Sequence, residues 1–127
     1  GVRFIVVVLL APIFEESFFR AGLLRILQST YSISFAKANF IQGFVGFSLY
    51  HLLAYGVFLG SLDTLTQLFG ATYAIIGSLI SAGLFGVLAG YLSNKFNNMV
   101  VVIVAHFIIN FILFTTALSV GTLFSIG

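Results

Sequence analysis

The sequence predicts an all-α fold, a polytopic transmembrane helix bundle of about four spans with short interfacial segments. Of the 127 residues, 61% are hydrophobic and only 6% are charged, whereas charged residues make up about 25% of a soluble domain. The mean hydropathy is +1.22. Apolar stretches, each close to the roughly 20 residues that cross a bilayer, alternate with short polar segments. We therefore expect an integral, multi-pass membrane protein.

The first apolar stretch, residues 3–27, contains Pro12. It is either one kinked span or a short approach followed by a helix that begins near Ile13. Similar length and hydropathy predict three further spans, at residues 38–59, 71–92 and 99–120. The polar segments between the spans are expected to be loops or tight turns, at residues 28–37, 61–70 and 93–98.

The few charged residues of the loops predict the topology. Four crossings place loops 28–37 and 93–98 on one side of the membrane, where they carry Lys37 and Lys95, with Arg25 just before the first loop. The opposite side has Asp63 and Arg3. By the positive-inside rule, loops 28–37 and 93–98 face the cytoplasm.

Composition also excludes several classes of function. Five basic and three acidic residues form no basic patch, so a nucleic-acid partner is not expected. The chain has no cysteine, which excludes disulfides, thiolate metal sites and a cysteine nucleophile. It begins at Gly1, and we expect residues 1–127 to be a single transmembrane domain of a longer protein.

Small residues recur every four positions in the third predicted span. A stripe of this kind lets a neighbouring helix approach closely in lipid, where association depends on packing. We expect the stripe to pack against another helix, through Ser78, Ala82, Gly86 and Gly90.

Ionisable residues lie within the spans, where each costs about 2.5–3.5 kcal/mol at mid-membrane unless it finds a partner. Glu16 and Arg20 are four residues apart and are predicted to form an ion pair on one helical face. Glu15 lies about 100° further round the helix, away from the Arg20 face. Glu15 is therefore the candidate base, and Glu16 with Arg20 is either a brace for the site or a purely structural ion pair.

Two other spans carry polar residues at the same spacing, Phe47 with His51 and His106 with Asn110. Each histidine lies well inside its span, as Glu15 does. Taken singly, either histidine or Asn110 could simply bond neighbouring helices together. Taken together, the polar residues of the three spans predict one buried, hydrated pocket.

The residues that form this pattern resemble a known family. EESFFR (residues 15–20) resembles an EExxxR motif, FSLYH (47–51) an FxxxH motif and HFIIN (106–110) an HxxxN motif. These are the motifs of the CAAX protease and bacteriocin-processing (Abi) family of intramembrane proteases. The resemblance implies that the chain is the catalytic core of a longer protein, because members usually carry further helices ahead of the first motif.

Peptide hydrolysis needs a base to deprotonate water and donors to stabilise the oxyanion. Consistent with the family, Glu15 would take the proton from a water held jointly with His51, while His106 and Asn110 would face the carbonyl oxygen. Phe47 would pack beside His51. The alternative is one zinc ion bound by Glu15, His51 and His106, although the HExxH signature is absent.

Two classes of function remain open. The first is an intramembrane endopeptidase that cuts a prenylated CAAX tail or another peptide, such as a bacteriocin leader, as the resemblance implies. The second is a non-enzymatic membrane protein, either an immunity factor or a proton-relay or transport element that uses the same buried groups. Both have membrane lipid as their surroundings.

Overall fold

The computed structural model describes the backbone of residues 1–59 and 65–125, and the side chains of residues 1–53 and 72–116. Within these ranges every regular element is a helix, which confirms the predicted all-α class. The predicted position of Asp63 in a loop lies outside the described residues. Two helical stretches, Thr72–Phe96 and Met99–Thr116, are long and apolar enough to cross a membrane.

The first helical rod runs without interruption from Val2 to Ser29 and includes Pro12. The helix is therefore continuous through Pro12, and no separate helix begins near Ile13. Two of its segments are π-helical, so that some N–H groups bond to the carbonyl five residues back instead of four. Its elements are α1 (Val2–Phe4), η1 (Ile5–Leu10), α2 (Ala11–Glu16), η2 (Ser17–Leu24) and α3 (Arg25–Ser29).

Three further rods complete the described chain. The second consists of α4 (Phe35–Phe40), η3 (Ile41–Phe47) and α5 (Ser48–Leu59), the third is α6 (Leu65–Phe96), and the fourth is α7 (Met99–Ser125).

The connections are shorter than the sequence suggested. The expected loop at 28–37 shrinks to residues 30–34, residues 65–70 of the expected loop 61–70 are helical, and α6 continues through most of 93–98. These polar segments contain no proline that would end a helix, so the neighbouring helices continue into them. Asn97 ends α6 in a left-handed conformation with φ 46°. The Asn98 side chain then accepts a 2.9 Å hydrogen bond from the Val100 N–H and caps α7.

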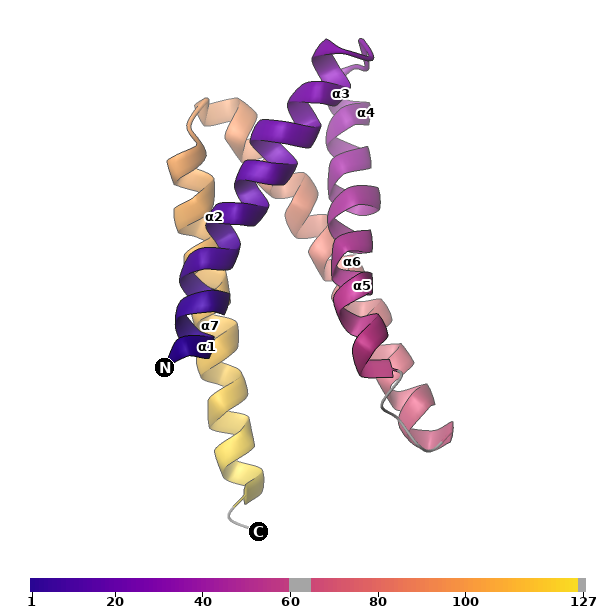
Figure 1. Cartoon of the computed structure of the whole chain (residues 1–127), viewed down its shortest axis with the longest axis vertical. Helices are drawn as coiled ribbons and strands as arrows, with labels where there is room; N and C mark the ends of the chain where they lie inside the picture. The colour runs from indigo at the N-terminus through magenta and orange to yellow at the C-terminus, as the bar shows by residue number, and fades with distance from the viewer. Residues whose placement is uncertain (60–64, 126–127) are drawn as a thin grey trace.

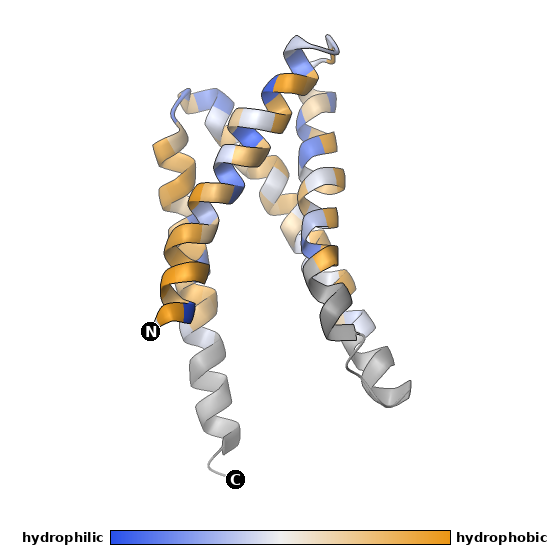
Figure 2. Ribbon diagram, viewed as in Figure 1, coloured by the Kyte–Doolittle hydropathy of each residue, from blue (hydrophilic) through white to orange (hydrophobic). Residues whose placement is uncertain are grey.

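The rods form two arms joined at one end (Figure 1). One arm pairs α7 with the N-terminal half of the first rod, and the other pairs α6 with the η3–α5 rod. Both tight turns, residues 30–34 and 97–98, lie at the joined end, and the arms diverge towards the opposite end. Figure 2 shows mainly apolar residues along the described helices and the more hydrophilic ones near the turns.

The predicted close contact of α6 occurs at its crossing with η3, but it involves only half of the small-residue stripe. A Cβ atom on Gly86 would lie 2.8 Å from the Cα of Gly43, so the backbones touch. Gly90 likewise leaves no room for a Cβ beside Asn39. Ser78 and Ala82 instead line an open cavity. The same stripe therefore packs against η3 at one end and faces the cavity between the arms at the other.

Candidate active site

Glu16 and Arg20 form the predicted ion pair in the first rod. Arg20 Nε lies 3.1 Å from Glu16 Oε2, and neither side chain has any exposed surface. Arg20 also donates from Nη2 to the Gly86 carbonyl at 3.3 Å and lies over the Phe47 ring at 4.7 Å. The guanidinium therefore ties the first rod to η3 and α6.

His106 lies between the two glutamates. Its Nδ1–H donates to Glu16 Oε1 at 2.6 Å, and its Nε2 lies 3.6 Å from Glu15 Oε2. Only 4% of His106 is exposed. A carboxylate on Nδ1 fixes the tautomer and ring orientation of a histidine. Glu16 thus has a second contact that its sequence spacing did not reveal, in addition to the ion pair with Arg20.

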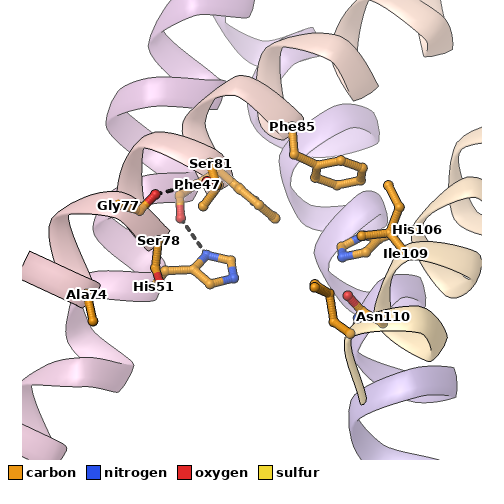
Figure 3. A pocket seen from close by; sticks show the side chains of 12 residues that line it. Phe47, His51, Ala74, Gly77, Ser78, Ser81, Phe85, His106, Ile109 and Asn110 are labelled. Carbon is orange, nitrogen blue, oxygen red and sulfur yellow. Dashed lines mark hydrogen bonds between the residues drawn. The ribbon is translucent and has the colours of Figure 1, made fainter. Parts of the chain in front are cut away.

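His51 faces the same space from the other arm (Figure 3). Its Nδ1–H donates to the Phe47 carbonyl at 2.8 Å, one helical turn earlier. This bond places a proton on Nδ1, so in a neutral ring the lone pair is on Nε2. The Phe47 and His51 ring centroids are 4.6 Å apart, so Phe47 lies beside His51 as expected. Phe47 therefore supports both His51 and Arg20.

Asn110 binds the first rod as well as facing the cavity. Its Nδ2 donates to the Val7 carbonyl at 3.0 Å. In this π-helical segment the Ala11 N–H bonds to Val6 O, five residues back, so the next helical partner for Val7 O would be the nitrogen of Pro12. Proline has no N–H, and the Asn110 amide takes its place. One N–H of the Asn110 amide is thus used to join two helices.

The cavity between the arms has a volume of about 540 Å³ and brings together Phe47, His51, His106 and Asn110. Glu15 does not line it. Instead Glu15 lines an adjacent apolar groove of about 300 Å³ together with Tyr50 and three phenylalanines. The Tyr50 ring is 5.4 Å from the His51 ring, so groove and cavity adjoin. Glu15 is therefore connected to the cavity through His106, whose Nε2 lies 3.6 Å from Glu15 Oε2.

Three contributors to the site were not identified from the sequence. Phe85 of α6 packs against His106 with ring centroids 4.6 Å apart. The completely buried Gln42 donates from Nε2 to Asn39 Oδ1 and to the Gly86 carbonyl, both at 2.8 Å. Gln42 and Asn39 are polar residues three apart in an apolar span, and that pattern is a usable signal. Phe85 carries no such signal.

The proposed zinc ligands were compared with the geometry that a metal requires. Among the described side chains, which include Glu15, His51 and His106, no group of three or more His, Cys, Asp or Glu residues is placed to hold a metal ion. Glu16 occupies Nδ1 of His106 and the Phe47 carbonyl occupies Nδ1 of His51, which leaves Nε2 of each ring as the atom that could bind a metal. The side chains as placed do not fit a three-ligand site, and zinc dependence stays a prediction.

Comparison with known proteins adds one finding. A family model described as type II CAAX prenyl endopeptidase Rce1-like matches residues 2–112. The match includes both glutamates, both histidines and Asn110. No curated protein and no solved structure matches the chain.

Proposed function

Since the chain belongs to the Rce1-like family of type II CAAX prenyl endopeptidases, it is a membrane protease of the CAAX type, and we propose that it cleaves a peptide bond within the membrane with water activated by Glu15. The observation that carries this proposal is the buried imidazole of His106 held between Glu16 and Glu15, beside a cavity that His51 and Asn110 also line. Glu16 and His106 are buried and Glu15 and His51 are half-buried, and ionisable groups placed together at membrane depth are costly unless they have partners or a function.

Glu15 is the proposed base because it has no cation paired with it on its own helix, whereas Arg20 neutralises Glu16. A water between Glu15 and His51 would give its proton to the Glu15 carboxylate. The Nε2 lone pair of His51 would accept the second hydrogen of that water and orient it. The oxygen would then attack the carbonyl carbon of a peptide bond lying in the cavity.

The developing oxyanion needs donors from the opposite wall. His106, protonated and held by Glu16, would supply one donor from Nε2, and the second N–H of the Asn110 amide would supply another. The proton on Glu15 would pass to the leaving amine. Preorganised donors of this kind contribute about 10²–10³-fold to the rate each.

The proposed substrate is the C-terminal segment of a prenylated protein or another peptide presented from the lipid. A direct test incubates the full-length protein, reconstituted in lipid, with matched prenylated and unprenylated peptides, with and without a chelator. We expect cleavage that survives chelation. If chelation abolished the activity and zinc restored it, the result would contradict activation of water by Glu15 alone and support the zinc mechanism.

Glu15→Gln should lower kcat at least 10²-fold, because the amide cannot accept the proton from the attacking water. It should unfold at nearly the same temperature as the wild type, since Gln retains the shape of Glu. Full activity in a folded Glu15→Gln protein would eliminate Glu15 as the base. Proton flux across liposomes in the absence of any peptidase activity would favour the transport alternative.

A further inference from the structure

The cavity has one wall made almost entirely of small side chains. His51 lies on one side and His106 with Asn110 on another, whereas α6 contributes Phe85 beside His106 and, further along, only the small residues Ala74, Gly77, Ser78, Ser81 and Ala82 (Figure 3). A peptide bond placed against the two histidines would therefore have a neighbouring side chain directed at α6. The size of the α6 side chains would limit the size of that substrate side chain.

Gly77 differs from the other glycines of α6 whose surroundings are described. A Cβ atom on Gly77 would meet no atom of the described residues within 4 Å. A Cβ on Gly83 would lie 2.5 Å from Phe44, and one on Gly86 would lie 2.8 Å from Gly43. Gly83 and Gly86 are thus required by helix packing. A glycine inside a helix is less stable than an alanine, and packing gives no reason for one at position 77.

The volume of the cavity restricts what occupies it. One turn of an α-helix, about 10 Å across with a 5.4 Å pitch, fills about 400 Å³. The cavity of about 540 Å³ therefore holds little more than a single turn. The cavity is open on one side, so a longer segment can extend beyond it, and a few residues of extended chain fit beside the two histidines. The occupant best suited to this space is a short extended segment of the substrate.

We propose that Gly77, on the α6 wall, is the specificity-determining residue that sets the size of the substrate side chain next to the scissile bond. This inference rests on the proposed endopeptidase function. It assigns a selective role to a residue that lies outside the three motifs and makes no contact with their side chains.

The first experiment enlarges the wall and measures selectivity. Gly77→Ala, Gly77→Leu and Gly77→Phe are assayed in the full-length protein with peptides carrying Ala, Leu or Phe beside the cleaved bond. One methylene-sized change in a pocket alters the ratio of kcat/KM between two substrates by about 10- to 200-fold. We expect Gly77→Phe to lower kcat/KM for the Phe peptide at least 10-fold more than for the Ala peptide, mainly through KM.

Two matched variants separate this effect from misfolding. Ile76→Phe adds the same ring on the neighbouring position, which is 50% exposed and does not line the cavity, so selectivity should not change. Gly83→Ala should lower thermal stability because of its contact with Phe44, whereas Gly77→Ala should not. An unchanged ratio of Phe to Ala cleavage in a folded Gly77→Phe protein would overturn the proposal.

A second measurement does not depend on catalysis. The chain has no cysteine, so Gly77→Cys introduces a single thiol that a maleimide can label. In the Glu15→Gln background, a substrate peptide should slow labelling of Gly77→Cys several-fold and leave Ile76→Cys unaffected. Protection without cleavage by the wild type would support the peptide site and contradict the protease function. Labelling of Gly77→Cys that no peptide slows would contradict the site.

Discussion

The two adjacent glutamates have different partners although both contact one imidazole. Glu16 is paired with Arg20 and with His106 Nδ1, whereas Glu15 approaches only Nε2. A carboxylate on the far nitrogen of a histidine orients the ring and stabilises its charge, as in hydrolases that use an acid–histidine pair. We therefore expect Glu16 to have two roles, one in stability and one in activity, and these roles can be separated.

Glu16→Gln should lower the free energy of unfolding by about 3–5 kcal/mol, because it leaves the buried Arg20 cation without a counter-ion. The double variant Glu16→Gln/Arg20→Met removes both charges and should recover most of that stability. Thermal unfolding in detergent measures the stability, and the peptide assay measures activity. We expect the double variant to be folded and at least 10-fold less active. Wild-type activity in that variant would show that Glu16 is only a structural partner of Arg20.

At the scale of elements, the helices are joined by side chains that donate to backbone carbonyls of neighbouring helices. The Gly86 carbonyl receives both Arg20 and Gln42, and the Val7 carbonyl receives Asn110. In each case a small residue or a proline makes the contact with the carbonyl possible. Gly43 and Gly86 let the backbones meet, and Pro12 removes the N–H that Val7 would otherwise bond. These contacts fix the positions of the rods that carry the site.

Asn110→Leu should therefore destabilise the protein by about 1 kcal/mol, the scale of an interhelical hydrogen bond in a membrane. Adding Pro12→Ala restores an N–H for the Val7 carbonyl and should recover part of this loss. The same Pro12→Ala change in the wild type should give a smaller gain, because Asn110 already serves that carbonyl. A double-mutant cycle on unfolding free energies measures the coupling. Strict additivity would mean that Pro12 and Asn110 do not share the carbonyl.

At the scale of the whole molecule, both short turns lie at the joined end of the two arms (Figure 1). Lys37 follows one turn and Lys95 precedes the other, so both cations are near the same end. This arrangement agrees with the requirement of the positive-inside rule that they share a side of the membrane. The rule assigns that side to the cytoplasm.

Single cysteines test this orientation, because the chain has no native thiol. Lys37→Cys and Lys95→Cys should react with a membrane-impermeant maleimide from the cytoplasmic side alone. Arg3→Cys, at the beginning of the first rod, should react only from the opposite side. Labelling of Lys95→Cys from the outside would reverse the predicted orientation.

The sequence also predicted several parts of the site, and the reason is local geometry. The Glu16–Arg20 pair and the Phe47–His51 contact each join residues four apart, which helical periodicity places on one face. The Glu16–His106 bond joins residues 90 apart, and the Asn110–Val7 bond joins residues 103 apart. These contacts depend on how one rod is rotated against another, and the periodicity within a single helix does not predict that rotation.

The sequence by itself therefore determined the helical class, the membrane setting and the set of polar side chains, since hydropathy and i,i+4 spacing are properties of single segments. Only the tertiary structure decided which nitrogen each glutamate holds, that Pro12 and Asn110 share a carbonyl, and that half of the small-residue stripe lines a cavity. These features depend on how the rods cross, which the Gly43–Gly86 contact and the packing of side chains fix.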